Sequence, residues 1–511
     1  MHELQHHHVL RSGRSLYYQT INKCSAHPGN VDKCQVDWTG TGSIKGSEDC
    51  LFLNIYTPAL PDLGENLLLR PVMLWIHGGG FEIGDATEFT DPEFILEEGV
   101  VFVALQYRLG LLGFLSVENS TELTGNFGLK DQQEAMRWVQ QNIAAFGGDP
   151  SKVTLFGESA GAISVHQHVL SPTSRGLFRA GILQSGTALM FYERLIERTT
   201  EREGERLLQV LGCDKASRPL DCLQGLEVEA LLNPEFEADL WTVQDNLSAK
   251  PVLPFDPLQQ LMSGAFHKVP LIVGVTKDDG AVVEAFRDLL EEVFEAEGKE
   301  TWSQLALGAN LGNVTSTERL IVSHYLGRKQ SGSFEENLPA IMDLHFDAIY
   351  ASPAHMVSKL HGKKAPVYSY LLNSRCNDVS TASLFSAMDV TEDLVFHGDD
   401  IPCIFKPDGK VFGEQRPGQA KTSRAVVRAW TNFAKHLQPE PSLSWDLTGN
   451  RWTPGGRPML FQVQSAVLTE QEEEMQPYKS RKDRLELWSA LYWRQKKREI
   501  DAKDGLYGFN R

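Results

Sequence analysis

The stretch Val153-Thr154-Leu155-Phe156-Gly157-Glu158-Ser159-Ala160-Gly161 decides the fold of this chain. Its first four residues predict a buried strand, and a helical pattern begins directly at Ala160. The G-x-S-x-G motif between them predicts a tight turn at Ser159, where flanking glycines let strand and helix approach closely and leave the hydroxyl exposed. The start of the helix favours negative charge beside that hydroxyl. We therefore predict that Ser159 is a nucleophile.

Strand-like and helix-like segments alternate along the chain around this turn. An amphipathic helical pattern runs from Leu129 to Ala145, and the Gly-Gly-Asp-Pro sequence at 147–150 ends it. Further apolar runs predict buried strands at Val72–Ile76, Val100–Leu105, Ala180–Leu183, Leu271–Val275 and Val367–Leu371. This alternation is typical of an α/β fold with a central, mostly parallel sheet and helices on both faces.

A glycine-rich loop, His77-Gly78-Gly79-Gly80-Phe81, follows the first of these predicted strands. A serine that attacks a carbonyl carbon needs N–H groups to stabilise the negative charge that forms on the oxygen. One donor is the N–H of the residue after the nucleophile, Ala160, and the others come from a loop of this kind. Glycines let the backbone turn its N–H groups inward without obstruction by side chains.

The composition excludes several classes of protein. The chain has 511 residues, 41% of them hydrophobic, and 67 acidic against 49 basic residues give a net charge of −18. An acidic protein repels phosphate backbones, so we expect no nucleic-acid partner. A soluble, acidic, secreted protein is the simpler interpretation, and attraction of cationic substrates is the alternative. No apolar run of roughly 18 residues predicts a membrane span.

Neither end of the sequence predicts a targeting segment. The stretch from Met1 to Arg14 is rich in histidine and lacks an apolar core, so we predict no signal peptide and expect a solvated end there. The tail from Lys496 to Arg511 is polar and predicts no lipid anchor. We nevertheless expect an extracellular, glycosylated protein, because sequons begin at Asn119, Asn246 and Asn313.

The cysteines also favour an oxidising, extracellular compartment. Seven are present: Cys24, Cys34, Cys50, Cys213, Cys222, Cys376 and Cys403. No pair has C-x-x-C spacing, so we predict no metal site. Cys213 and Cys222 bracket a short polar loop, and either Cys24 or Cys34 is able to close a larger loop onto Cys50, spacings that suit disulfides. The partners of the last two cysteines stay open, and the odd count leaves at least one thiol unpaired.

Several motifs together resemble the type-B carboxylesterase and cholinesterase family. They are Ser47-Glu48-Asp49-Cys50-Leu51-Phe52-Leu53-Asn54, the glycine-rich loop at 77–81, Asn126-Phe127-Gly128-Leu129-Lys130-Asp131-Gln132, Phe146-Gly147-Gly148-Asp149-Pro150 and the nucleophile motif. The resemblance implies the α/β-hydrolase fold and one catalytic domain over residues 47–495. It leaves an N-terminal segment at 1–46 and a polar C-terminal tail at 496–511.

The resemblance also implies a catalytic triad. The family's acid lies in a K-D-E-G motif, which here reads Lys277-Asp278-Asp279-Gly280, so Asp279 stands where the family usually has glutamate. Its base lies in an H-G-x-E/D motif, here His397-Gly398-Asp399-Asp400. The order Ser159, Asp279, His397 is the one expected of an α/β-hydrolase. Asp278 is the alternative acid, and we expect Asp399 and Asp400 to hold the local loop.

Other roles follow from the same resemblance. Gly79, Gly80 and Ala160 correspond to the oxyanion donors, Glu158 and Ser185 are expected beside the triad, and Cys213 and Cys222 match a disulfide of the family. Independently of the resemblance, we expect His77 to be a structural loop residue, and we expect His166 and His168, which follow the nucleophile on its helix, to lie in the core or just behind the site. Family members usually carry a longer segment before the S-E-D-C motif, with an initial hairpin that we do not find here, so we expect a truncated start.

The predicted activity is hydrolysis of a small-molecule carboxylic ester through a covalent acyl-enzyme, with no metal and no cofactor. One rival is an adhesion protein that keeps this fold but binds partners instead of hydrolysing esters. Another is a true cholinesterase, which would need a choline-binding tryptophan; Trp38 is the candidate, but its spacing to Cys50 fits poorly. The acyl and alcohol groups and the oligomeric state stay open.

Overall fold

The computed structural model describes part of the chain in detail. The described residues are 7–11, 14–22, 34–36, 44–60, 68–87, 91–190, 198–232, 240–287, 290–291, 325, 333–385, 394–406, 415–439, 460–464, 467–469, 484 and 488.

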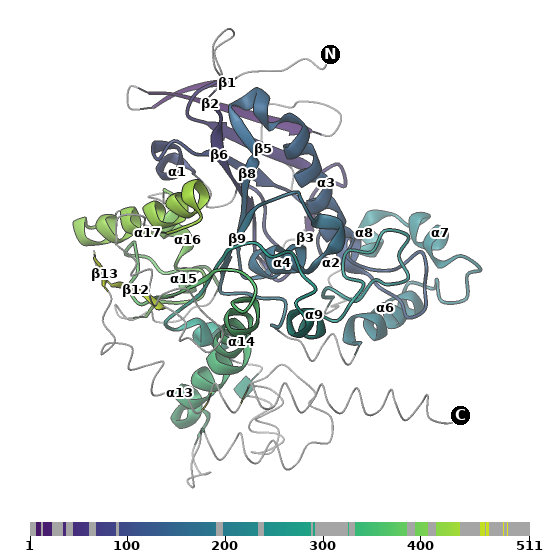
Figure 1. The fold of residues 1–511 in the computed structure, drawn as a ribbon. Coiled ribbons are helices and arrows are strands. Elements are labelled where there is room, and N and C mark those ends of the chain that lie inside the picture. The colour runs from purple at the N-terminus through teal and green to yellow at the C-terminus, as the bar shows by residue number, and fades with distance from the viewer. Residues whose placement is uncertain are drawn as a thin grey trace.

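Eleven strands form one sheet in the order β1-β2-β5-β7-β6-β8-β9-β10-β11-β12-β13 (Figure 1). Their bounds are β1 His7–Arg11, β2 Arg14–Asn22, β5 Phe52–Thr57, β6 Arg70–Ile76, β7 Val101–Leu105, β8 Gly148–Glu158, β9 Ala180–Gln184, β10 Leu271–Thr276, β11 Val367–Leu372, β12 Leu460–Gln464 and β13 Val467–Thr469. Neighbours from β7 to β12 pair in parallel, whereas the pairings at both edges are antiparallel. A separate pair, β3 Cys34–Val36 and β4 Ile44–Gly46, is antiparallel.

Helices cover both faces of this sheet (Figure 1). One face packs against α1 Glu93–Glu97 and α17 Pro417–His436, and the other packs against α3 Phe127–Asn142, α4 Ala160–Leu170 and α14 Ser352–His361. Successive residues of the central strands alternate between the two cores: Val72 and Leu74 belong to one, Met73 and Trp75 to the other. Every residue of β7, β9 and β10 is buried, as expected for parallel strands between two helical layers.

The remaining described helices lie mostly in the connections. The α-helices are α2 Gly110–Phe114, α6 Thr199–Val210, α7 Pro219–Gln224, α8 Val228–Leu231, α9 Pro257–Ser263, α13 Phe334–His345, α15 Ala382–Phe385 and α16 Ile401–Ile404. The others are the 3-10 helices η1 Ile143–Phe146, η2 Pro172–Ser174 and η3 Asp279–Phe286 and the π-helix η4 Phe346–Ala351. In the part of the chain described, no helix is both long and apolar enough to cross a membrane.

The fold class predicted from the sequence is confirmed. Each predicted strand corresponds to one of the observed strands β6 to β11, and the predicted amphipathic helix corresponds to α3. Strand β8 is longer than expected because it already pairs with β6 at Gly148.

The expectation that the chain lacks an initial hairpin is wrong. Strands β1 and β2 form an antiparallel hairpin, and β2 continues the sheet by pairing with β5. The physical reason lies in residues 16–21, Leu-Tyr-Tyr-Gln-Thr-Ile, which are rich in the aromatic and β-branched residues that strands favour. This propensity is general and forms no family motif.

Two disulfides close loops among the described residues. Cys213 bonds to Cys222 between α6 and α7, as the resemblance implies, and Cys376 bonds to Cys403, a pair that the sequence left open. Cys50 is also disulfide-bonded.

The turn from β8 into α4 packs directly against β6. A Cβ on Gly161 would lie 2.0 Å from the carbonyl oxygen of Ile76, and one on Gly157 would lie 2.6 Å from the same oxygen. These separations are far below any ordinary contact, and the obstacle is backbone, which has little freedom to move. The two glycines therefore hold the strand, the turn and the neighbouring strand in one compact unit.

We expect Gly161→Ala to lower the free energy of unfolding by about 1–3 kcal/mol or more, because the added methyl group overlaps the Ile76 carbonyl. Gly418→Ala is the matched control, since a Cβ there meets nothing within 4 Å. Urea unfolding curves of both variants measure the difference. Equal stability of the two variants would contradict the close approach described above.

Candidate active site

Ser159 occupies the sharp turn between β8 and α4. Its backbone has φ 54° and ψ −123°, a conformation that side-chain-bearing residues rarely adopt. The Ser159 N–H donates to the carbonyl of Gln184 on β9 at 2.8 Å, and the Ser159 carbonyl accepts from Ile163 in the first turn of α4 at 2.9 Å. The residue is therefore fixed by neighbours on both sides, with Ala160 as the first residue of the helix.

The glycine-rich loop after β6 lies alongside this turn. Gly79 and Gly80 have φ angles of 104° and 63°, in the region that favours glycine. A Cβ on Gly78 would lie 2.8 Å from the Glu158 carbonyl oxygen and 3.2 Å from the Ser159 Cβ, so the loop approaches the serine closely. The predicted oxyanion residues Gly79, Gly80 and Ala160 are thus brought into one neighbourhood.

Asp279 is fully buried directly after β10, and its carboxylate has three partners. Oδ1 lies 2.8 Å from His397 Nδ1, whereas Oδ2 accepts from the Ser185 hydroxyl at 2.8 Å and from the Thr276 N–H at 2.9 Å. Asp278, the alternative acid, instead accepts from the Val395 N–H at 2.9 Å. Of the two aspartates, only Asp279 contacts the histidine.

His397 lies on a loop that Asp399 organises. The Asp399 carboxylate accepts from the Phe396 N–H at 2.8 Å, from the Thr381 N–H at 2.8 Å and from the Ser380 hydroxyl, and the Thr381 hydroxyl donates to the His397 carbonyl at 2.7 Å. The Cys376–Cys403 disulfide closes the same loop covalently. Asp399 therefore holds the loop, as the sequence analysis expected.

Glu158 is the second carboxylate beside the imidazole. Its Oε1 lies 3.1 Å from His397 Nε2, and both side chains are largely buried. Burial alone would lower the pKa of His397, but the negative charge of Glu158 and the hydrogen bond to Asp279 outweigh it and raise that pKa to about 9. Burial raises the pKa of Glu158 as well, although the charge of His397 opposes this. The pair therefore retains a proton more strongly than isolated side chains would.

Two tyrosines near the site carried no recognisable signal in the sequence. The Tyr350 ring lies 5.0 Å from the His397 ring, and it belongs to the π-helix η4 between α13 and α14, a local distortion frequent at functional sites. The Tyr370 hydroxyl donates to Asp400 at 2.7 Å. Because neither tyrosine stands in a motif, only the tertiary structure reveals these contacts.

Other candidate residues are structural or lie elsewhere. His166 and His168 are fully buried on α4, and burial lowers the pKa of each to about 3, so both are neutral core residues as expected. His77 stacks on the ring of Tyr107. Trp38 and the sequon at Asn313 lie outside the described residues.

Phe81, at the end of the glycine-rich loop, connects the site to a distant segment. Its ring packs edge-on against Trp241 at 5.6 Å and against Phe114 at 4.8 Å. Its backbone is also left-handed, with φ 65°, and its carbonyl accepts from the Gly110 N–H at 2.7 Å. The segment that carries Trp241 therefore packs against the glycine-rich loop through the ring of Phe81.

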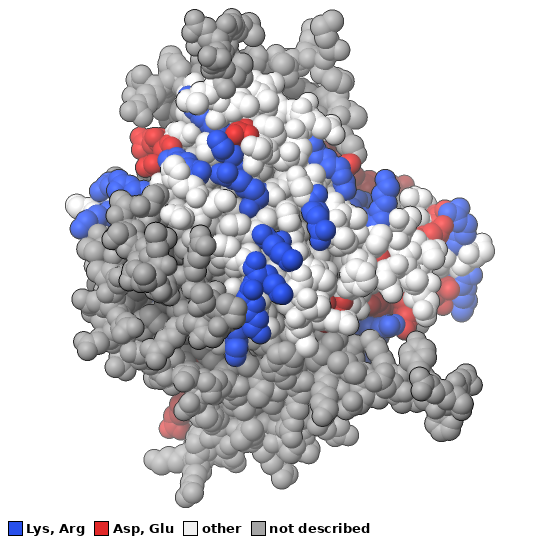
Figure 2. All heavy atoms as spheres, viewed as in Figure 1, with Lys and Arg blue, Asp and Glu red and all other residues white. Residues whose placement is uncertain are grey.

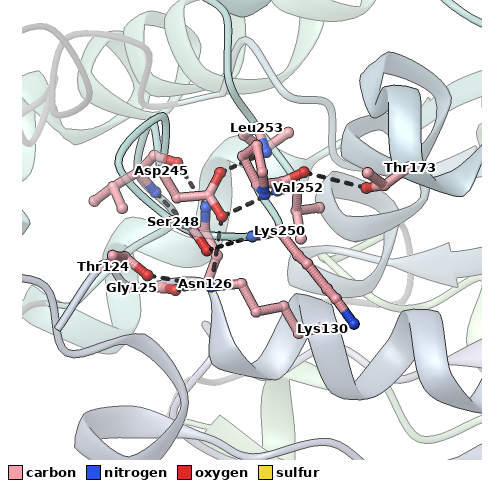
Figure 3. Close-up of polar contacts among 12 residues, drawn as sticks. Thr124, Gly125, Asn126, Lys130, Thr173, Asp245, Ser248, Lys250, Val252 and Leu253 are labelled. Atoms are coloured by element: carbon pink, nitrogen blue, oxygen red, sulfur yellow. Dashed lines mark hydrogen bonds and ion pairs between the residues drawn. The ribbon is translucent and has the colours of Figure 1, made fainter. Parts of the chain in front are cut away.

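Polar contacts anchor that segment to the start of α3 (Figure 3). The Asn126 amide pairs with the backbone of Val243 in both directions, at 2.7 and 3.0 Å. Asp245 is buried and accepts from the N–H groups of Val252 and Leu253 at 3.0 and 2.7 Å, and it lies 3.6 Å from the Lys130 ammonium group. Burial lowers the pKa of Lys130, and the nearby charge of Asp245 opposes this.

Comparison with known proteins agrees with this arrangement. The model of the Carboxylesterase family matches residues 17–483. The chain is 32% identical to a juvenile hormone esterase of Tribolium castaneum, over 79% of this chain and 73% of the relative. It is 35% identical to an acylcarnitine hydrolase of Mus musculus, over 78% of this chain and 69% of that relative. It is 33% identical to a cocaine esterase of Homo sapiens, over 77% of this chain and 68% of that relative.

The parallel sheet, the serine on the turn after β8 and the flanking helices define an α/β-hydrolase. Within that class, the chain belongs to the carboxylesterase family. It is an enzyme that hydrolyses carboxylic esters, as its named relatives are esterases and hydrolases.

The contact between Glu158 and His397 generates a prediction about pH. A histidine that acts as general base must be neutral. With His397 in the role that the sequence predicts for it, its raised pKa should place the acid limb of the kcat/KM profile above the pH usual for histidine. Glu158→Gln removes the negative charge and should move that limb to lower pH. Glu134→Gln, an exposed change on α3, is the control. A limb that stays in place, or moves upward, would refute the electrostatic role of Glu158.

Proposed function

We propose that this enzyme hydrolyses small-molecule esters in two steps, with Ser159 as nucleophile, His397 as general base and Asp279 as the acid that orients it. The observation that supports this assignment most directly is the 2.8 Å contact between Asp279 Oδ1 and His397 Nδ1, at the carboxyl end of β10 beside the Ser159 turn. The contact fixes the tautomer whose Nε2 is free to accept a proton.

In the first step, His397 Nε2 takes the proton of the Ser159 hydroxyl while the serine oxygen attacks the ester carbonyl carbon. The N–H groups of Gly79, Gly80 and Ala160 stabilise the oxyanion, and removal of one such donor typically costs about 2.7–4 kcal/mol. The C–O bond to the alcohol portion then breaks while His397 gives its proton to the leaving alkoxide oxygen, which departs as the neutral alcohol. The acyl group remains on Ser159 as an ester.

In the second step, water attacks this acyl-enzyme. His397 again takes a proton, this time from the water, and a second oxyanion forms in the same place. Collapse releases the carboxylic acid and returns the proton to Ser159. The chemistry needs no metal or organic cofactor.

Glu158 is the resting partner of His397 in this proposal. Within the described part of the chain, Ser159 Oγ has no hydrogen bond, and His397 Nε2 lies against Glu158 instead. Catalytic contacts are often absent before substrate binds and form only in the complex. We infer that substrate brings the imidazole from Glu158 to Ser159.

The adhesion alternative is not favoured, because the site retains serine, histidine and carboxylate, and the relatives are named for hydrolysis.

We also propose that the protein passes through the secretory pathway. Cys213–Cys222 and Cys376–Cys403 need an oxidising compartment, and the exposed positions of Asn119 and Asn246 suit glycan attachment.

Ser159→Ala should abolish hydrolysis of p-nitrophenyl esters, with a loss of several orders of magnitude in kcat, while the unfolding curve stays unchanged. A fluorophosphonate label should appear on the peptide that contains Ser159 in the wild type and be missing in the variant. Ser185→Ala is the control, since it keeps the nucleophile and should still be labelled. Retention of more than about a tenth of wild-type kcat would remove Ser159 from the mechanism.

Asp279→Asn should lower kcat by roughly 10⁴, because an amide favours the wrong histidine tautomer. Asp278→Asn is matched in size and neighbouring in sequence, but its side chain contacts the Val395 N–H and not the imidazole, so it should cost far less. Steady-state kinetics of the two variants decides between the aspartates. If Asp278→Asn is the more damaging change, Asp278 takes the place of Asp279 in the triad.

A further inference from the structure

A group of exposed cations lies at the end of the molecule opposite the nucleophile turn. Helix α4 begins beside Ser159 and runs for eleven residues, about 16 Å, to Leu170. At its far end, the Leu170 carbonyl accepts from Gln260 on α9 at 2.9 Å, and the Val169 carbonyl accepts from the His267 N–H at 2.9 Å. The segments around these contacts carry the exposed cations.

Three segments meet there, at 171–179, 246–268 and 359–366. The Thr173 hydroxyl donates to the Pro251 carbonyl at 3.2 Å, and the Pro366 carbonyl accepts from the Leu271 N–H directly after the second segment. The Lys364 side chain lies over Gly264, where a Cβ would be 2.8 Å from it. Arg175 is close enough to His267 to lower the pKa of that imidazole further, beyond the larger effect of burial.

We call the exposed lysines and arginines of these segments the basic face. They are Arg175, Lys250, Lys268, Lys359, Lys363 and Lys364. The only acidic residue in the three segments is Asp256, which is buried and caps α9 by accepting from the Gln259 N–H at 2.7 Å. None of the six cations forms an ion pair with any residue that the structure describes. In a chain of net charge −18, such a cluster stands out.

The surface of the molecule also shows cations gathered apart from anions. On the face drawn in Figure 2, Lys and Arg side chains lie across the centre, whereas most Asp and Glu lie toward the edges. Several exposed cations on segments that meet present repeated contacts to a linear polyanion, and each contact adds affinity while remaining sensitive to salt.

We propose that the basic face binds a sulfated polysaccharide. Its sulfate groups would pair with the six cations, and the location at the far end of α4 would leave the Ser159 turn accessible. The choice of a sulfated glycan over other polyanions rests on the proposed passage through the secretory pathway, where sulfated glycans are available. The binding itself does not depend on ester hydrolysis.

The test is binding of the full-length protein to immobilised heparin at low and at physiological ionic strength. The wild type should bind and should elute as salt rises. The variant Arg175→Gln/Lys268→Gln/Lys364→Gln should lose about tenfold or more in affinity, since three exposed charge contacts disappear. The variant Arg202→Gln/Arg206→Gln/Lys215→Gln, with the same change of charge around α6, should bind like the wild type. Hydrolysis of a soluble ester should be equal in all three proteins, which also verifies folding.

Two further measurements distinguish a sulfated polysaccharide from a carboxylated one and from a membrane surface. Hyaluronan, which carries carboxylates but no sulfates, should bind more weakly than heparin. Phe255 and Met262 are exposed beside the basic face, at 58% and 41%, so a membrane is the other surface that the region resembles. Phe255→Ser/Met262→Ser should leave heparin binding unchanged. Binding to phosphatidylserine vesicles but not to heparin, equal binding of both triple variants, or no heparin binding by the wild type would overturn the proposal.

Discussion

The whole site depends on one close approach of backbone to backbone, at the turn from β8 into α4. Gly157 and Gly161 leave no space for a side chain against Ile76, and Gly186 packs equally closely against the Ser159 carbonyl, where a Cβ would lie at 2.3 Å. This packing compensates for the unfavourable φ of Ser159, since strained backbone persists only where its surroundings determine it. It also fixes the helix start and the glycine-rich loop relative to the hydroxyl.

The nucleophile turn was predictable from the sequence because its determinants are local. A strand, a G-x-S-x-G turn and a helix follow one another within a few residues, and each leaves its own pattern. The central strands were predictable for a similar reason, since parallel strands buried on both faces are continuous apolar runs. The hairpin of β1 and β2 had local signals too, in its aromatic and β-branched residues, but a motif search does not detect them.

The rest of the site was not predictable from local patterns. Asp278 and Asp279 are adjacent and chemically identical, and only the tertiary structure directs one to His397 and the other to Val395. The pairing of Cys376 with Cys403 depends on how two loops meet, which spacing does not reveal. Glu158 was expected beside the triad, but only from the resemblance, which does not reveal its contact with Nε2 of the imidazole. Tyr350 stands in no motif, and its contact with the imidazole joins parts of the chain far apart in sequence.

The order of the three groups along the chain has a consequence for biosynthesis. The serine turn lies in the first half of the chain, whereas the imidazole follows Asp279 by 118 residues and lies beyond β11. Chains emerge from the ribosome with the N-terminal part first. A nascent chain therefore contains the residues of the serine turn while it still lacks His397. If His397 is the base, as we propose, a translation product that ends before residue 397 is inert rather than partly active.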